Sequence, residues 1–480
     1  MSKEKQIKNS ILYLLPVILS NLLPLLTLPI FTRILTKEDY GVWALAQVYA
    51  IFVNGIANFG LTVGYERNFF EYKEGKKVAG LLYSTLSFVL VSFFIFGTFT
   101  WIFKNSLAEW IIGSHDHASI LFLSYCTVSI VGLKNYYLTY YKNTENAKSF
   151  VWYSIDESLL GVLFSFYMVV FMRIGIIGLV WGQLLASLII FILLSFKISK
   201  TMPVCFDKNA LKDSLQLSWP LTPRIFFGII GSQFDKYMIG LLNTVGGVGV
   251  YSIGQKVANT IFVFMTAIQN VYSPQVYRRM FEMGEDGKAA IGKYLTPFLY
   301  VSIFIGLLVA HFSEEMIWIL TPESYHEATN IIIVLSMLYV TYFFGKQPQL
   351  VFAKKTHLVS LLTLISIGLN VAINIPFIYK WGAIGAAWGT LVAGLISGAI
   401  SFIVSQRHYR IIWEYQKIGL MLLMFFSSAI IILCLRNFEV YYGIKLIVKI
   451  ISVVMFLYIG KHFSILSRVN CILIKKALVG

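Results

Sequence analysis

The sequence predicts an all-α integral membrane protein with about 14 transmembrane helices, arranged as two parallel six-helix repeats and a C-terminal helix pair. Two observations set the class: 58% of the 480 residues are hydrophobic and only 13% are charged. Apolar stretches of about 20 residues, the length that crosses a bilayer, recur along the whole chain. A third observation sets the arrangement, because two sequence motifs occur twice at nearly the same separation.

The predicted spans are separated by short loops that hold most of the charged residues. The first span follows the basic segment MSKEKQIKNS and has no small-residue cleavage site, so we interpret it as a retained helix and not as a signal peptide. The spans are expected near residues 10–31, 41–63, 78–103, 118–141, 150–172, 174–196, 214–242, 248–273, 289–313, 328–345, 358–379, 382–405, 417–435 and 440–460.

The basic residues predict the orientation of the chain. The net charge is +16, and the lysines and arginines lie in short loops and not on one soluble face, which argues against nucleic-acid binding. One set of alternate loops, together with both termini, holds roughly four times as many of them as the other set, so both termini are predicted to be cytoplasmic. Four isolated cysteines without metal-ligand spacing argue against disulfides and zinc sites: Cys126, Cys205, Cys434 and Cys471.

The two halves of the chain share an internal repeat. YGVWALAQ, which begins at Tyr40, recurs as VGVYSIGQ from Val248, and GIIGLVWGQL, which begins at Gly175, recurs as GAIGAAWGTL from Gly382. Each copy contains six spans and begins on the same side of the membrane, which predicts parallel halves with a binding site between them. We therefore expect three parts: 1–205, 206–412 as its repeat, and 413–480 with an additional helix pair and a cytoplasmic tail.

The span at Ser214–Leu242 carries three charged residues, namely Arg224, Asp235 and Lys236. Insertion scales assign each such charge a cost of roughly 2.5 to 3.5 kcal/mol at the centre of a lipid-facing helix, so these side chains are expected to face a wet cavity or a partner helix. Arg224 and Asp235 are nearly three whole turns apart and share one face. Packing against neighbouring helices through ion pairs is the alternative interpretation.

Polar residues also form a stripe on each of two repeat-equivalent spans, the second and the eighth. Amides on one helical face can line a hydrated path or hydrogen-bond neighbouring helices, and the sequence leaves both open. The candidate binding residues are Gln47, Asn54 and Asn58 in the second span, and Gln255, Lys256, Asn259 and Asn270 in the eighth, where Thr266 continues the stripe.

The remaining polar groups suggest no catalytic chemistry. Lys134, Asp156 and Glu157 lie inside the fourth and fifth spans, where a local ion pair or snorkelling explains them as well as a function does. His115 and His117 lie in a loop without helical metal-ligand spacing. We therefore predict no catalytic residue, no metal site and no cofactor.

Several long motifs resemble one family of transporters. The segments TLPIFTRILTKEDYGVWALA, GSQFDKYMIG, VGVYSIGQK and GLNVAINIPFIYKWGAIGAAWGTL are similar to those of the polysaccharide transporter, or O-antigen flippase, family. That family belongs to the superfamily of multidrug, oligosaccharidyl-lipid and polysaccharide exporters, which has the fold of multidrug and toxic compound extrusion (MATE) proteins. The resemblance covers approximately residues 10–410.

The resemblance implies two six-helix bundles that form a V-shaped central cavity, lined by the first, second, seventh and eighth spans. It also implies a flippase of the bacterial cytoplasmic membrane, which moves an undecaprenyl-pyrophosphate-linked oligosaccharide, an O-antigen, lipopolysaccharide or capsule repeat unit, from the inner to the outer leaflet by alternating access. A polysaccharide polymerase and a chain-length regulator are the expected neighbours. In relatives that flip a peptidoglycan precursor, an extra helix pair accompanies a groove for the lipid tail.

Residue roles follow from this interpretation. Arg224 is the first candidate for the pyrophosphate, because a guanidinium offers two parallel donors to phosphate oxygens, and Lys256 and Lys236 are the second. Asp235 is the candidate for coupling to H⁺ or Na⁺. Two alternatives remain open: a cation-coupled small-molecule exporter of the same fold, and a membrane glycosyltransferase or polymerase, which usually needs larger outer loops.

Overall fold

The chain folds entirely into helices and connecting turns over the residues that the computed structural model describes, 3–72, 75–345 and 348–465. Within these ranges the side chains of 3–11, 13, 14, 17, 221, 224, 270, 271 and 356 lie outside the description. The contacts divide the chain into two compact units, residues 1–252 (unit 1) and 253–480 (unit 2). The predicted halves were defined by repeated sequence and not by contacts, so their boundaries stay a prediction.

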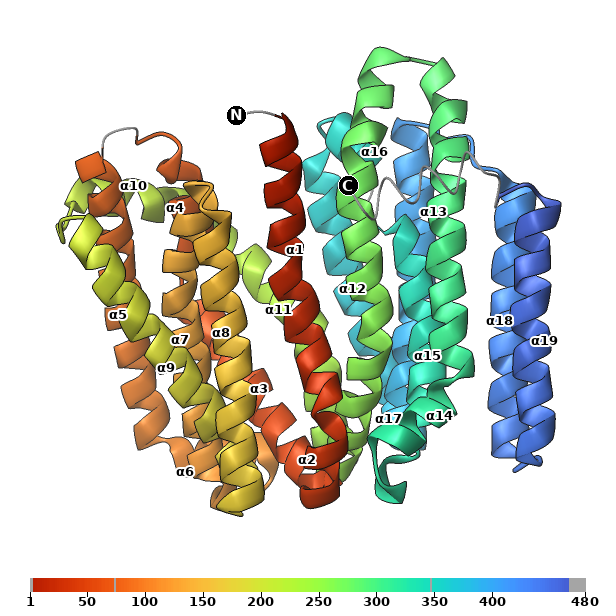
Figure 1. Ribbon diagram of the computed structural model, residues 1–480, viewed down its shortest axis with the longest axis horizontal. Helices are drawn as coiled ribbons and strands as arrows, with labels where there is room; N and C mark the ends of the chain where they lie inside the picture. The colour runs from red at the N-terminus through yellow and green to blue at the C-terminus, as the bar shows by residue number, and fades with distance from the viewer. Residues whose placement is uncertain (1–2, 73–74, 346–347, 466–480) are drawn as a thin grey trace. The chain divides into compact units, whose positions relative to one another are not determined.

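Unit 1 is a bundle of long helices joined by short ones (Figure 1). Its helices are α1 (Lys3–Leu26), α2 (Leu28–Ile34), α3 (Lys37–Ala57), α4 (Leu61–Phe69), α5 (Gly75–Ile102), α6 (Lys104–Ile112), α7 (Ala118–Asn143), α8 (Ala147–Phe166), α9 (Gly175–Thr201), α10 (Lys208–Ser218) and α11 (Thr222–Leu242), followed by the first turns of α12 (Val245–Glu282).

Unit 2 contains the rest of α12 and the helices that follow it (Figure 1). α18 and α19 form a hairpin, which corresponds to the predicted C-terminal pair. The helices are α13 (Asp286–His311), α14 (Ser313–Leu320), α15 (Ala328–Thr341), α16 (Pro348–Phe352), α17 (Thr356–His408), α18 (Tyr415–Asn437) and α19 (Tyr442–His462), with a 3₁₀ turn η5 (Tyr342–Phe344) after α15.

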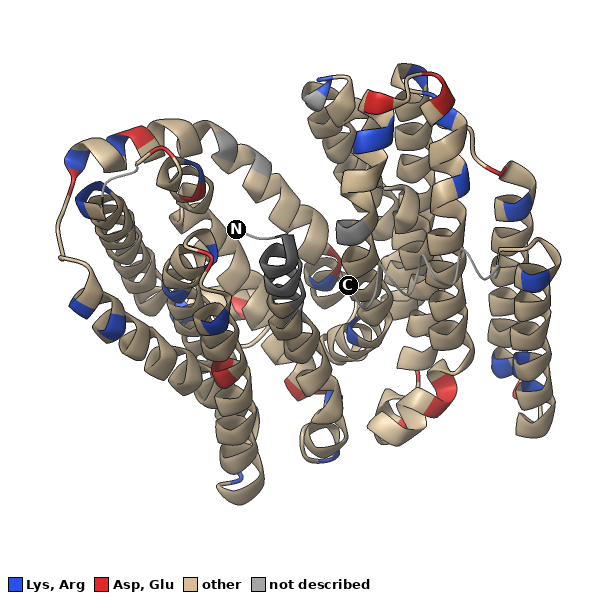
Figure 2. Ribbon diagram, turned by 45° about the horizontal axis from the view of Figure 1, so that its top comes forward, with Lys and Arg blue, Asp and Glu red and all other residues tan. Residues whose placement is uncertain are grey.

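The predicted fold class is confirmed. Eleven helices in the described residues are long and apolar enough to cross a membrane. One of them, α17, corresponds to two predicted spans. Its backbone is not helical at Gly382, where φ is 61°, and this break lies between the two spans. The predicted first and eighth spans correspond to α1 and α12, which lie outside these eleven. Charged residues lie mainly towards the helix ends in each unit (Figure 2), as expected of helices that cross lipid.

The predicted seventh span is not one regular helix. Its first residues belong to α10, the chain turns through a 3₁₀ segment at Trp219–Leu221, and α11 continues to Leu242. Pro220 lies in this segment and cannot donate a backbone hydrogen bond, which explains why the α-helix breaks there. Arg224 is consequently in the first turn of α11.

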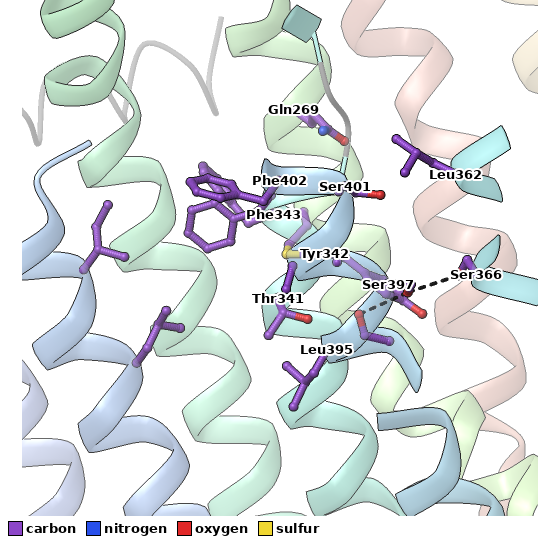
Figure 3. A pocket seen from close by; sticks show the side chains of 18 of the residues that line it. Gln269, Thr341, Tyr342, Phe343, Leu362, Ser366, Leu395, Ser397, Ser401 and Phe402 are labelled. Carbon is purple, nitrogen blue, oxygen red and sulfur yellow. Dashed lines mark hydrogen bonds between the residues drawn. The ribbon is translucent and has the colours of Figure 1, made fainter. Parts of the chain in front are cut away.

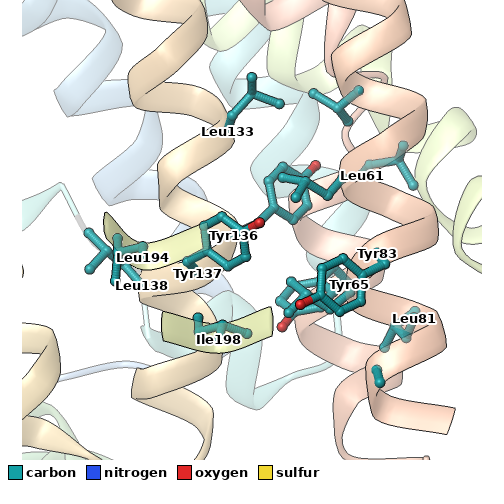
Figure 4. Packing of buried hydrophobic residues seen from close by; sticks show 14 of the residues in the cluster. Leu61, Tyr65, Leu81, Tyr83, Leu133, Tyr136, Tyr137, Leu138, Leu194 and Ile198 are labelled. Carbon is teal, nitrogen blue, oxygen red and sulfur yellow. The ribbon is translucent and has the colours of Figure 1, made fainter. Parts of the chain in front are cut away.

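The core of unit 1 is rich in tyrosine (Figure 4). Tyr65 and Tyr136 are fully buried, and their rings meet edge to face with centroids 5.5 Å apart. Tyr136 donates its hydroxyl hydrogen to Asn58 Oδ1 at 3.1 Å. A tyrosine can therefore fill this core and still hydrogen-bond a polar group inside it.

The glycines of the repeated GxIGxxWGxL motif have the same roles in both copies. Gly175 and Gly382 both have positive φ, 65° and 61°, which is the conformation that glycine tolerates best. A Cβ added to Gly182 would overlap the Ser165 backbone, and one added to Gly389 would lie 3.1 Å from the Asn374 Cα. In each copy, then, the first glycine permits a turn and the last one lets two helices touch.

This role predicts opposite effects of alanine at two glycines of α17. Gly389→Ala should reduce the free energy of unfolding by about 1 to 3 kcal/mol, because the new methyl group overlaps Asn374. Gly368→Ala, which meets no atom within 4 Å, should raise it by up to about 1 kcal/mol through helix propensity. Thermal unfolding of both purified proteins in detergent measures the difference, and equal midpoints would contradict the packing role.

Candidate functional site

A cavity that we assign to function lies in unit 2. Its volume is about 700 Å³, within the range of small-molecule binding pockets. The walls come from α12, the end of α15 with η5, both arms of α17 and the start of α18 (Figure 3). Gly398 on α17 has open space around it, which leaves room in the cavity wall.

The wall of this cavity is aromatic and uncharged. No Lys, Arg, Asp or Glu occurs among its lining residues, all of which belong to the described part of the chain. Phe344 packs edge to face against Trp413, with ring centroids 5.3 Å apart. The polar groups are hydroxyls and one amide: Thr266, Gln269, Thr341, Thr363, Ser366, Ser397 and Ser401 line it, with tyrosine hydroxyls besides. Ser366 donates to Ser397 Oγ at 3.2 Å.

A second, smaller cavity of about 320 Å³ shares part of this wall. Gln269, Tyr272, Phe343, Phe402 and Trp413 line both cavities. Gln269 is buried, and Ser273, Tyr277, Gln349 and Ser405 add polar groups to the smaller one. The aromatic residues thus separate two neighbouring spaces. The sequence predicted none of these aromatic residues, and of the larger cavity's wall it predicted only Thr266, in the α12 stripe. The run Tyr342–Gly345, YFFG, was the available sequence signal.

The α18 wall of the cavity is held in place by a buried charge cluster at the other end of the α18–α19 hairpin. Lys445 donates to Glu314 Oε1 at 2.6 Å, and Lys449 donates to Glu315 Oε1 at 2.6 Å. Lys449 is completely buried. Arg436, near the end of α18, donates to Asn330 Oδ1 and to the His326 carbonyl oxygen, both at 2.6 Å. These contacts attach both helices of the pair to α14 and α15.

The cluster depends on ionised Glu314. Burial favours the neutral carboxyl, but the hydrogen bonds and charges of Lys445 and Lys449 outweigh this effect and hold the pKa of Glu314 below its ordinary value. A carboxyl whose pKa is lower in the folded state contributes stability above its unfolded pKa, and this contribution is lost as the pH falls through the folded pKa. The cluster should therefore be intact at neutral pH and weaken in acid.

Two predicted charges, Asp235 and Lys236, lie together on α11. Asp235 is buried and accepts a hydrogen bond from the Tyr251 hydroxyl at 3.0 Å. Lys236 is half-buried, with Nζ 3.4 Å from Gln233 Oε1. Tyr251 is the repeat equivalent of Trp43. The coupling role of Asp235 stays a prediction, and its hydrogen bond shows that a neighbouring helix meets at least part of its charge.

Two of the predicted amides, Asn54 on α3 and Asn58 directly after it, hydrogen-bond α7 within unit 1. Asn54 is buried and donates to Ser129 Oγ at 3.3 Å, and Asn58 accepts from Tyr136. Gln47 is half-buried on the same helix. Both hydrogen bonds join neighbouring helices, which is the second of the two interpretations that the sequence left open. A role of these amides in binding cargo stays a prediction.

The remaining predicted residues belong to α11 and α12. Gln255, Lys256 and Asn259 are half-buried on α12 and are not among the lining residues of the cavity. The predicted side chains of Arg224 and Asn270 lie outside the described residues. Of the predicted residues whose side chains the structure describes, Thr266 of the α12 stripe is the one that lines the cavity.

Lys134 and Glu157 form the local ion pair that was one of the interpretations of the sequence. The Lys134 ammonium contacts Glu157 Oε2, and Ser187 donates to Glu157 Oε1 at 2.9 Å. The pair joins α7, α8 and α9 inside unit 1. It satisfies two charges that would otherwise be costly in the membrane.

A model of the family described as polysaccharide biosynthesis protein matches residues 7–274. The match covers more than half of the 480 residues. The chain belongs to this family. Membership in the polysaccharide biosynthesis protein family confirms the resemblance that the sequence motifs predicted.

One curated relative of this family member comes from Haloferax volcanii and is described as "Probable low-salt glycan biosynthesis flippase Agl15". The two sequences are 25% identical over 246 residues, which is 50% of this chain and 49% of the relative. The chain thus spans about half the length of the curated relative it matches.

Solved structures of transporters share the fold of this family member. The lipid II flippase MurJ in an inward closed conformation has a TM-score of 0.69 at 15% identity, covering 96% of this chain and 100% of the solved chain. An inward-facing multidrug resistance MATE transporter scores 0.59 at 14% identity, covering 83% and 98%. A transporter of the MOP superfamily from Pyrococcus furiosus scores 0.54 at 13% identity, covering 84% and 95%. These likenesses establish a multi-pass membrane transporter fold.

The charge cluster predicts a strong and pH-dependent effect of Glu314→Gln. At neutral pH the variant should lose about 3 to 5 kcal/mol of stability, because Lys445 and Lys449 both lose the buried carboxylate that they contact. Thermal unfolding from pH 7 to pH 3 measures this effect. The unfolding midpoints of the wild type and the variant should converge as the pH falls below about 4.5, the ordinary pKa of a glutamate.

The matched control is Glu414→Gln, at the residue that directly precedes α18. Glu414 is 2.6 Å from Lys417, but both side chains are partly exposed, at 22% and 30%, so the loss should be only about 0 to 1 kcal/mol. Equal losses in the two variants would show that the α14–α19 cluster does not attach the helix pair.

Proposed function

We propose that this protein is a flippase that moves a lipid-linked oligosaccharide from the inner to the outer leaflet of the bacterial cytoplasmic membrane by alternating access. An undecaprenyl-pyrophosphate-linked O-antigen or capsule repeat unit is the proposed cargo. Family membership, the fold shared with a lipid II flippase and the description of the H. volcanii relative support this proposal. The protein acts as a transporter and not as an enzyme, with both termini in the cytoplasm.

The observation that carries the proposal is the family match combined with the uncharged, aromatic cavity of unit 2. A lipid-linked saccharide has a long apolar chain, an anionic pyrophosphate and a polar sugar, which need different surroundings. A wall without charged groups suits the apolar chain and neutral carbon-rich surfaces of the cargo. The pyrophosphate requires cationic donors, and the cavity of unit 2 does not supply them.

The cationic donors in this proposal are the charged residues of α11 and α12. Arg224 binds the pyrophosphate, assisted by Lys236 and Lys256, and the amides Gln47, Asn54, Asn58, Gln255, Asn259 and Asn270 serve the sugar. Asp235 takes part in coupling to H⁺ or Na⁺. A polysaccharide polymerase and a chain-length regulator act on the product in the outer leaflet.

The function predicts distinct results for two substitutions of Arg224. Arg224→Ala should abolish export and Arg224→Lys should retain part of it, because lysine keeps the charge but not the paired donors of the guanidinium. The measurement is surface polysaccharide in a strain that lacks its own flippase, complemented with each variant and normalised to its abundance in the membrane. Wild-type levels from Arg224→Ala would contradict the role of this residue in binding the anion.

A second substitution tests the cavity itself. Gly398→Trp places a large side chain in the open space of the cavity wall and should reduce transport in the same complementation assay. Gly368→Trp is the matched control, because this glycine lies on the same helix, also has nothing within 4 Å and does not line the cavity. Equal transport by the two variants at equal abundance would remove the cavity from the transport path.

A cation-coupled exporter of small molecules is the second candidate. The similarity to a multidrug resistance MATE transporter and the aromatic cavity favour it. Accumulation of lipophilic cationic dyes in a strain without its own exporters distinguishes the two. If Gly398→Trp abolishes dye export and leaves surface polysaccharide unchanged, the result would favour the exporter.

A further inference from the structure

Two helices of the internal repeat begin with the same capping hydrogen bond. Thr36 precedes α3, and its Oγ1 accepts from the Asp39 backbone N–H at 3.1 Å. Thr244 precedes α12, and its Oγ1 accepts from the Gly247 N–H at 3.0 Å. Both threonines hold the same place before the repeated segments YGVWALAQ and VGVYSIGQ. The equivalent helices therefore start at equivalent residues.

These two helix starts touch each other reciprocally inside unit 1. A Cβ added to Gly41 of α3 would overlap the carbonyl oxygen of Val245, and one added to Gly249 of α12 would overlap the carbonyl oxygen of Lys37. Gly41 and Gly249 are repeat equivalents, as are Lys37 and Val245. Each copy thus offers the same glycine to the same carbonyl of the other, which is the pattern of a two-fold contact.

We call this contact, between Lys37–Gly41 and Val245–Gly249, the glycine crossing. It has an electrostatic cost, which acidic residues near the two helix starts offset. Two helix N-termini carry positive partial charges, and bringing them together is unfavourable. Glu38 supplies the opposite charge, because its Oε1 lies 2.8 Å from the position of a Cβ on Gly246, in the first turn of α12. Asp39 caps the first turn of α3.

The glycine crossing is the end of a longer seam along α3. Residues 41, 45, 52 and 55 lie on one face of this helix. Leu45 packs on Gly240, Phe52 on Phe226 with ring centroids 4.9 Å apart, and Gly55 on Ile229. Val48 belongs to the same face, about 10 Å from Gly41 along the helix, and is half-buried.

We propose that the glycine crossing is the contact that closes the transport path at the predicted outer face, and that it must separate when the path opens outward. This inference rests on the proposed alternating access and adds the residues that close one end. At both glycines the backbone of one helix start meets the backbone of the other. Gly41 and Gly249 themselves add no apolar side chain to this contact.

The test places a wedge in the contact. Gly41→Ala and Gly249→Ala, combined in one protein, should favour the separated state and raise the labelling rate of Val48→Cys by a membrane-impermeant maleimide in intact cells by about fivefold or more. The background lacks the native cysteines. Gly368→Ala, where a methyl group meets nothing, is the control and should leave labelling unchanged. An unchanged rate in a double variant of normal abundance would overturn the proposal.

A second experiment uses a disulfide to hold the contact closed. It does not require the protein to fold with the two alanine substitutions. The Lys37 Cγ lies 3.4 Å from the position of a Cβ on Gly246, so Lys37→Cys and Gly246→Cys can be joined by oxidation. The joined protein should lose polysaccharide transport and regain it on reduction. Transport that is equal in the joined and reduced forms would overturn the proposal. Labelling that follows the wedge in a protein without polysaccharide transport would instead support the crossing and refute the cargo.

Discussion

The structure depends on one constraint: polar and charged groups within a membrane protein must find their partners inside the protein. Lys134, Glu157 and Ser187 join three helices of unit 1 in this way. Glu314 and Glu315 do the same for Lys445 and Lys449 in unit 2. In both places an ionisable residue that looks costly in a hydropathy plot is the point at which helices are held together.

This use of charge affects how a functional site is found. A charged residue in a predicted span suggests a ligand, but several of the charges here are met by neighbouring helices, and no charged residue lines the cavity of unit 2. In the proposed function, the aromatic cavity without charge serves the apolar portion of a lipid-linked saccharide and a separate set of cations serves its anionic portion, since the two need different environments. The family to which the chain belongs gives this division a biological context.

Close approach of helices is the second principle of the fold. The repeated motif GxIGxxWGxL and the pair Gly41 and Gly249 place backbone against helix where a single methyl group would not fit. Because dispersion contacts fall off steeply with distance, such positions determine how tightly helices pack in lipid, where the hydrophobic effect gives little preference. The internal symmetry of the sequence is thus visible as equivalent contacts in three dimensions.

The sequence by itself determined the helical membrane class, the internal repeat and the family. These properties depend on local composition and on short motifs, so each can be recognised without knowing what a residue touches. The repeated glycines could be recognised as well, although their purpose could not.

Only the tertiary structure decided which helices those polar residues join. Asn54 bonds Ser129 and Lys445 bonds Glu314, and no spacing within one helix reveals a partner far away in the chain. The cavity of unit 2 was hidden for the same reason, because its wall combines residues from helices that are distant in sequence, and ordinary apolar residues give no local signal that they border a space. A hydrophobic pattern indicates that one face of a helix is buried. Which helix that face packs against depends on side-chain packing, which is a property of the assembled chain.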